Sequence, residues 1–334
     1  MTDASDDRIQ PLADDRPANW SENLILTSFD RSSGLSVYVH MGRMAPEADV
    51  WEGVLSVFLP DREHLLVSRT FGSDACRSAA SSGNLVFSCD TPLQRWSLRY
   101  DGMARRVTSS AAAAAPIADG PVERLRVDLT LDGLHDAWVM NKAALSQQSW
   151  GHFHLEQACR VHGHVVVEGS PIPIECTGFR DHTYGARSYG PLTHEAWVNC
   201  VFPSGRVIMA MLVEEAGAPP LRTGFVVAEG LARPLTMVAA PALTSAAGLP
   251  AAVEVTLETG AKRTTAAVVQ CHAMSYTLQA PVGFSLGVSY EDPDSVVLVE
   301  GPAIFDWDGE QGFGWLERLR RVRALQRPNV RAPR

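Results

Sequence analysis

The residues best suited to chemistry lie in one segment, residues 152–199. Within it Arg180, His182 and Tyr184 are spaced two apart, so in a strand their side chains share one face. A histidine transfers protons near neutral pH, a tyrosine hydroxyl offers a second proton site, and an arginine can stabilise an enolate-like charge. These three are the predicted catalytic residues, for proton chemistry on an alkene, an enone or an activated C–H bond.

A hairpin around the turn Glu168–Pro171 must position these side chains. If Glu168 faces Pro171 across a two-residue turn, then Gln157 faces His182, on the face that carries the predicted catalytic residues. That face is otherwise apolar, and burying an unpaired charge costs several kcal/mol. The side chains are therefore predicted to form a polar cluster in an apolar cavity, and a self-satisfied core network is the alternative left open.

The same register directs Glu156, Asp181 and His154 to the opposite face of the hairpin. Metal binding is a further alternative, because the segment contains two His-x-His pairs, His152/His154 and His162/His164. The pairs lie roughly 27 Å apart on an extended strand, so they cannot share one ion without a bend. They are predicted to face solvent, and no metal site is predicted.

Most of the remaining chain consists of short β-branched or alternating runs separated by turn residues. This pattern predicts an all-β protein whose antiparallel meanders close into barrels, since closure removes exposed strand edges. Three segments depart from it. Residues 1–18 are predicted to be a flexible tail, Ser109–Ala118 a flexible loop, and Trp315–Leu325 a short C-terminal helix with leucines at helical spacing.

Composition limits the function. The 334 residues are 46% hydrophobic and carry a net charge of −9, which argues against binding to a phosphate backbone. The chain has neither the roughly 20 continuous apolar residues of a membrane helix nor a signal peptide, so we expect a cytoplasmic protein without membrane insertion. The scattered cysteines are expected to be reduced packing residues: Cys76, Cys89, Cys159, Cys176, Cys200 and Cys271.

The run Gly178-Phe-Arg-Asp-His-Thr-Tyr-Gly-Ala-Arg187 resembles the Gly-x-Arg-Asp-His-Ser-Trp-Gly-x-Arg signature of a two-domain lipocalin-like superfamily. That superfamily includes carotenoid hydratase and AttH-like proteins. The pairs Trp20-Ser-Glu with Phe29-Asp, Glu156-Gln157, and the run Gly312-Phe-Gly-Trp-Leu-Glu317 agree with it, so the resemblance spans roughly residues 19–325.

The resemblance implies two lipocalin-like domains around a long apolar pocket. We place them at residues 19–180 and 181–326, followed by a tail at 327–334. In the carotenoid hydratase the histidine and tryptophan of the signature act with a Tyr-x-Asp pair on a following strand. His182 matches that histidine, but Tyr184 replaces the tryptophan, and Val207–Val213 contains no carboxylate. Carotenoid hydration itself is therefore in doubt.

The resemblance also implies an enzyme without an organic cofactor, and no nucleotide-binding fingerprint is present. We expect hydration, isomerisation or cyclisation of a hydrophobic terpenoid, steroid-like or polyketide substrate. A homodimer is left open, and a non-catalytic carrier of such a molecule is the alternative function. The expected substrate-binding residues are Gln157, Glu156, Asp181, Arg187, Trp197 as a stacking wall and Asn199 as a carbonyl-orienting amide.

Overall fold

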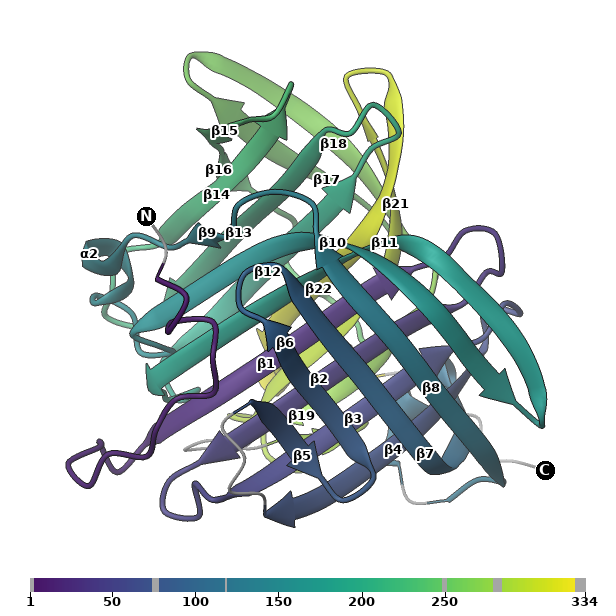
Figure 1. The fold of residues 1–334 in the computed structure, drawn as a ribbon. Coiled ribbons are helices and arrows are strands. Elements are labelled where there is room, and N and C mark those ends of the chain that lie inside the picture. Colours follow the sequence, from purple (N-terminus) through teal and green to yellow (C-terminus); the bar gives the residue numbers. More distant parts are fainter. Residues whose placement is uncertain (1–2, 74–77, 118, 248–250, 279–283, 328–334) are drawn as a thin grey trace.

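The computed structural model describes residues 3–73, 78–117, 119–247, 251–278 and 284–327. Nearly all regular structure in these ranges is antiparallel β-strand, arranged in two sheets (Figure 1). The all-β prediction is thus confirmed. None of the helices in the described ranges has the length and apolar character that a membrane span requires.

The first sheet runs in the order β4-β3-β2-β1-β11-β10-β8-β7-β6-β5, and β9 pairs with β10. A further pairing of β4 with β7 curls this sheet into a barrel. Its strands are β1 (Trp20–Phe29), β2 (Ser36–Met44), β3 (Val50–Phe58), β4 (His64–Ser73), β5 (Ala79–Ser82), β6 (Leu85–Thr91), β7 (Arg95–Thr108), β8 (Val122–Gly133), β9 (Trp138–Val139), β10 (Phe153–Val167) and β11 (Ser170–Ala186).

The second sheet runs in the order β15-β14-β13-β12-β22-β21-β18-β17-β16, and β19 pairs with β20 and β21. Its strands are β12 (Leu192–Val201), β13 (Val207–Glu215), β14 (Leu221–Ala228), β15 (Leu231–Pro234), β16 (Thr236–Ala239), β17 (Ala251–Thr259), β18 (Lys262–Gln270), β19 (Met274–Leu278), β20 (Phe284–Leu286), β21 (Val296–Trp307) and β22 (Glu310–Arg321). The first sheet ends at Ala186 and the second begins at Leu192, so residues 187–191 connect the two sheets.

The hairpin of β10 and β11 has the expected faces with a different register. Glu168 and Gly169 form its two-residue turn, both with positive φ (51° and 80°), as a type I′ turn requires. Gln157 therefore lies opposite Arg180, two residues away from the predicted pairing with His182. A shift of two residues keeps every side chain on its face, so the predicted division of the hairpin into two faces is confirmed.

The predicted C-terminal helix is wrong. Its residues belong to β22, which pairs with β21 and β12, and only a short 3₁₀ turn, Val322–Ala324, follows. The spacing of Leu316 and Leu319 fits a helix face, but in the strand the two leucines pack on opposite sides of the sheet. Because both faces of β22 are buried, apolar residues occur at odd and even positions along it. This dense apolar pattern also fits the spacing of a helix.

Two other segments also differ from expectation. Ser109–Ala114 forms the short helix α1, capped by the Thr108 hydroxyl, which accepts a hydrogen bond from the Ala111 amide. A second one-turn helix, α2, spans Lys142–Leu145. Within the predicted tail, Asp7 is completely buried and Ile9 joins the core of the first sheet. Of the predicted C-terminal tail, residues 328–334 lie outside the described residues.

The two sheets pack against each other through a shared apolar layer. In this layer the Tyr38 ring from β2 stacks on the Trp315 ring from β22, with ring centres 5.9 Å apart. Phe58 meets the same indole edge-on at 5.4 Å. The interface between the sheets is thus a third core, separate from the interior of each sheet, and it is where the candidate site lies.

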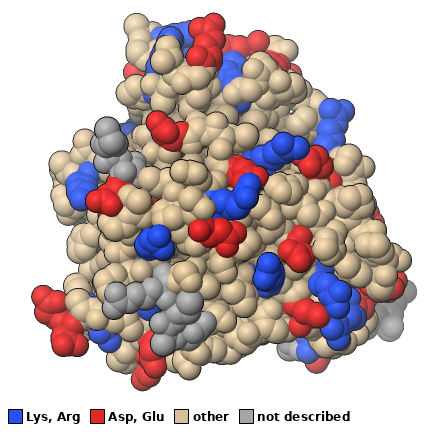
Figure 2. All heavy atoms as spheres, in the orientation of Figure 1, with Lys and Arg blue, Asp and Glu red and all other residues tan. Residues whose placement is uncertain are grey.

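The described residues include charged side chains of both signs at the surface and several cysteines. On the face drawn in Figure 2, basic and acidic side chains are interspersed, without a broad basic patch. The described cysteines are free thiols: Cys89, Cys159, Cys176, Cys200 and Cys271. Cys76 lies outside the described residues.

Candidate functional site

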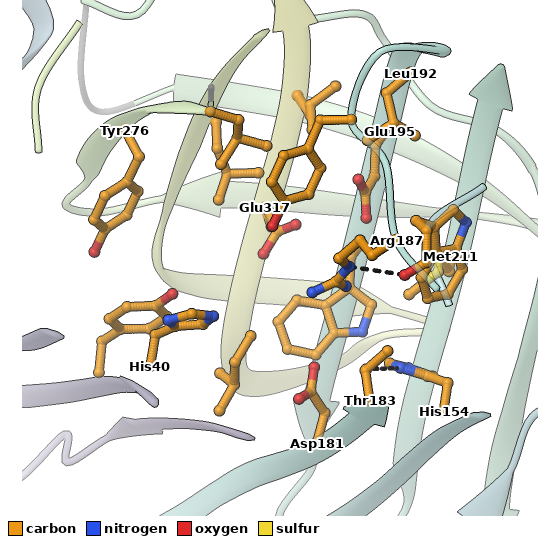
Figure 3. Close-up of a pocket in the computed structure, with 18 residues that line it drawn as sticks. His40, His154, Asp181, Thr183, Arg187, Leu192, Glu195, Met211, Tyr276 and Glu317 are labelled. Carbon is orange, nitrogen blue, oxygen red and sulfur yellow. Dashed lines mark hydrogen bonds between the residues drawn. The ribbon is translucent and has the colours of Figure 1, made fainter. Parts of the chain in front are cut away.

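A cavity of about 100 Å³ lies between the two sheets (Figure 3). Both sheets and the segments next to them contribute to its walls. The lining residues are Ile25, Tyr38, His40, Trp150, His154, Asp181, Thr183, Arg187, Tyr189, Leu192, Glu195, Trp197, Met211, Tyr276, Leu278, Leu298, Glu317 and Leu319.

Three carboxyl groups from three different strands reach this cavity. Asp181 comes from β11, Glu195 from β12 and Glu317 from β22. Because β12 and β22 are neighbours with Trp197 opposite Glu317, the alternation along each strand brings Glu195 and Glu317 to the same face. Figure 3 shows the three carboxyl groups around one space, with the Arg187 side chain among them.

Burial controls the protonation of these acids. It raises the pKa of Asp181 to about 7, although the neighbouring His154 acts in the opposite direction. Burial also raises the pKa values of Glu195 and Glu317, and repulsion between the carboxylates adds to the effect. Asp181 Oδ1 is buried without a hydrogen-bond partner among the described residues. The cavity therefore holds acids that keep a proton near neutral pH.

A histidine network supports the Asp181 side of the cavity. The Nδ1 atom of His154 lies 2.6 Å from Thr183 Oγ1, and its Nε2 atom lies 3.0 Å from Glu156 Oε1. Burial lowers the pKa of His154 to about 4 and raises that of Glu156. His154 is thus neutral at physiological pH and is fixed in orientation by both ring nitrogens.

Ligand atoms of His154, Glu156 and Asp181 lie within 4.8 Å of one another, close enough to hold one metal ion. A metal at His154 Nε2 would have to replace the hydrogen bond with Glu156. In the structure both ring nitrogens of His154 are instead hydrogen-bonded, one to Thr183 and the other to Glu156.

The rest of the cavity wall is aromatic and aliphatic. Trp150, Trp197 and Tyr189 line it beside the acids, and Tyr38 and Tyr276 line the part toward β2. Such walls accept apolar ligands, and ring faces attract positive charge. The cavity therefore combines proton donors with surfaces for a hydrophobic molecule.

The predicted catalytic residues lie on the other face of β11. Arg180, His182 and Tyr184 point into the first sheet's own interior and are absent from the described cavity lining. Arg180 is held by Asp7 at 2.5 Å and by the Gln157 side chain at 2.6 Å. This is the self-satisfied core network that the sequence left open.

Their neighbours complete the network. His182 Nε2 lies 2.8 Å from Glu22 Oε1, and the Tyr184 hydroxyl donates to Asp6 at 3.2 Å. Glu22 also accepts hydrogen bonds from Arg43. In this structure segment 3–10 contacts all three side chains or their partners, and none of the three lines the cavity between the sheets.

Three of the six predicted substrate-binding residues line the cavity, and the other three lie elsewhere. Asp181, Arg187 and Trp197 line the cavity. Glu156 lies behind His154, and Asn199 lines a separate, much smaller hollow beside Trp315. Gln157 belongs to the Arg180 network.

Sequence reasoning missed several cavity residues. It assigned His154 to solvent, although this side chain is 2% exposed, and it gave no role to His40, Glu195 or Glu317. A signal was present: a glutamate two residues from a tryptophan, as in Glu195-Ala-Trp197, recurs in Trp315-Leu-Glu317. An acid that shares a strand face with a buried indole is a candidate for an interior carboxyl group.

Solved structures share this architecture of two packed antiparallel sheets. A putative AttH from Nitrosomonas europaea is similar over 92% of this chain and 98% of its own, at 12% identity and a TM-score of 0.59. Kievitone hydratase from Nectria haematococca is similar over 94% and 93%, at 13% identity and a TM-score of 0.52. CghA in complex with Sch210972 is similar over 91% and 89%, at 9% identity and a TM-score of 0.58.

These similarities confirm the AttH-like fold that the signature indicated. The chain belongs to the family described as Domain of unknown function (DUF7064), which matches residues 3–322. None of the curated proteins compared with the chain matches its sequence.

Proposed function

We propose that the protein is an enzyme that transfers protons to and from a hydrophobic small molecule without an organic cofactor. The reaction is a hydration, a cyclisation or a double-bond isomerisation. The observation that carries this proposal is the convergence of Asp181, Glu195 and Glu317 on one cavity walled by aromatic side chains. The expected substrate is terpenoid, steroid-like or polyketide in character.

The chemistry follows from the state of the acids. A carboxyl group whose pKa lies near 7 is present in both protonated and ionised forms at neutral pH, so it can give a proton and take one back. Adding the proton to a carbon–carbon double bond leaves a cation. The indole and phenol faces around the cavity can stabilise that cation until water adds, a ring closes or a proton leaves.

We assign proton transfer to these acids rather than to His182 and Tyr184. His182 is fully buried against Glu22, and the half-buried Tyr184 hydroxyl donates to Asp6. A substrate could reach His182 only after its buried partners had moved. One solved protein of the same fold is named a hydratase, which supports a reaction of this class.

The test uses the hydrophobic compound that co-purifies with the protein from its own host, identified by mass spectrometry. The wild-type protein is incubated with this compound in D₂O, and the product and the recovered compound are analysed for deuterium bound to carbon. Glu317→Gln and Asp181→Asn should each slow incorporation by about 100-fold or more, which is the usual contribution of a general acid or base.

Two controls make this outcome specific. Asp128→Asn changes an exposed aspartate on β8 and should leave incorporation unchanged. Tyr184→Phe should also retain deuterium incorporation. If only this variant lost incorporation, the active site would lie in the interior of the first sheet. If the wild-type protein and all variants bind the compound but none exchanges or converts it, the protein is a carrier and the proposal is wrong.

A further inference from the structure

Arg187 has an unusual position in the cavity. Its backbone is fixed by two hydrogen bonds with Asn19, at 2.9 and 3.1 Å. Its Nε atom donates to the Trp150 carbonyl at 2.7 Å, and the guanidinium lies 5.7 Å from the centre of the Tyr189 ring. Backbone and Nε are thus held, and the two terminal nitrogens have no hydrogen bond or ion pair with any described residue.

The acids of the cavity do not neutralise this charge. No carboxylate in the described part of the chain lies within ion-pair distance of Arg187, although its charge acts through space on Asp181 and Glu195. This differs from Arg180 and Arg43, the buried arginines of the first sheet, which each bind a carboxylate directly. Arg187 is half-buried, and its terminal nitrogens are donors that can bind an anion entering the cavity.

We propose that the substrate carries a carboxylate, which binds to the two terminal nitrogens of Arg187 while its apolar body lies against Trp197 and Trp150. The inference deepens the proposed function, on which it rests. A guanidinium presents parallel donors that match the two oxygens of a carboxylate. Protonated Asp181 and Glu195 can donate to the same oxygens, whereas a cationic ligand would be repelled by Arg187.

The geometry also sets the orientation of the substrate. With the carboxylate at Arg187, the adjoining carbons lie among the three cavity acids, where Figure 3 places the Arg187 side chain. A double bond conjugated with or near the carboxylate would therefore face the proton donors. Arg187 acts in this scheme as a binding and positioning residue.

The test measures binding, so it does not depend on turnover. Benzoate and benzyl alcohol have a similar apolar body, and only benzoate carries the anion. Their dissociation constants are measured by isothermal titration calorimetry for the wild-type protein, Arg187→Gln, Arg187→Lys and the control Arg222→Gln, which changes an exposed arginine on β14. Circular dichroism confirms that each variant is folded.

The wild-type protein and Arg222→Gln should prefer benzoate by about 10-fold or more, as a charge-assisted pair provides. Arg187→Gln should lose the preference, and Arg187→Lys should keep only part of it, since a lysine is a point charge without the fork. Equal binding of the two probes to the wild-type protein, or an unchanged preference in Arg187→Gln, would overturn the inference. If Arg187→Gln does not fold, the Arg187→Lys result decides in the same way. If the wild-type protein incorporates deuterium but shows no preference for benzoate, only this inference is refuted. If it prefers benzoate but incorporates no deuterium, only the proposed function is refuted.

Discussion

Replacing Asp181 by asparagine should change how the stability of the protein depends on pH. The carboxyl group is 8% exposed, and its pKa rises from 3.8 to about 7 on folding. The folded state therefore binds this proton more tightly than the unfolded chain does. The Asp181 contribution to stability falls as pH rises from about 4 to about 7 and is constant above that range.

The magnitude follows from the size of the shift. About three pKa units correspond to about 4 kcal/mol in total, and the part of the window between pH 5 and pH 7 corresponds to about 3 kcal/mol. The asparagine amide cannot ionise, so the stability of the variant does not decrease with pH through this group. Relative to the wild-type protein, Asp181→Asn should gain about 3 kcal/mol in free energy of unfolding between pH 5 and pH 8.

The assay is urea unfolding followed by tryptophan fluorescence at pH 5, 6, 7 and 8, with Asp128→Asn as the control. The exposed Asp128 should show no such pH-dependent difference from the wild-type protein. A constant difference between Asp181→Asn and the wild-type protein at all four pH values would refute the reasoning. It would mean that Asp181 is ionised throughout this range, and that it is not one of the proton donors of the proposed function.

Three other predictions follow from the packing and the networks. Asp7→Ala should lower the free energy of unfolding by about 3–5 kcal/mol in urea titrations, because it leaves Arg180 buried without its carboxylate. The double variant Asp7→Ala/Arg180→Met should recover part of this loss. A double variant as unstable as Asp7→Ala would contradict the explanation. Gly314→Ala should lower it by several kcal/mol, because a Cβ there would overlap the Asn199 carbonyl and separate β22 from β12, and a melting temperature like that of the wild type would contradict the pairing. Dialysis against EDTA should change neither the melting temperature nor deuterium incorporation, because both His154 ring nitrogens are engaged; a loss reversed by Zn²⁺ would assign His154, Glu156 and Asp181 to a metal site.

The sequence was sufficient for the fold class and for the faces of the β10–β11 hairpin, because alternation along a strand is a local property. It could not show which face meets a cavity. Arg180 and His182 look like functional groups when taken alone, and their partners Asp7 and Glu22 are about 160 or more residues away. Only the fold brings these partners together.

The same limit explains the missed acids. Glu317 lies in a stretch whose apolar spacing also fits a helix, so neither its strand nor its neighbour Trp197 could be inferred. The predicted tail failed for a related reason. Its acidic composition is typical of a mobile segment, but one aspartate, Asp7, meets the buried Arg180 and fixes residues 3–10 over the first sheet.

We propose that the substrate binds between the two sheets, beside Asp181, Glu195 and Glu317. The most direct test is a crystal structure of the protein with the compound that co-purifies from its host. We expect this compound in the cavity of Figure 3, with a polar group at Arg187 and its apolar body against Trp197. Electron density for the compound inside the first sheet, against His182 and Tyr184 with Asp7 displaced, would contradict it.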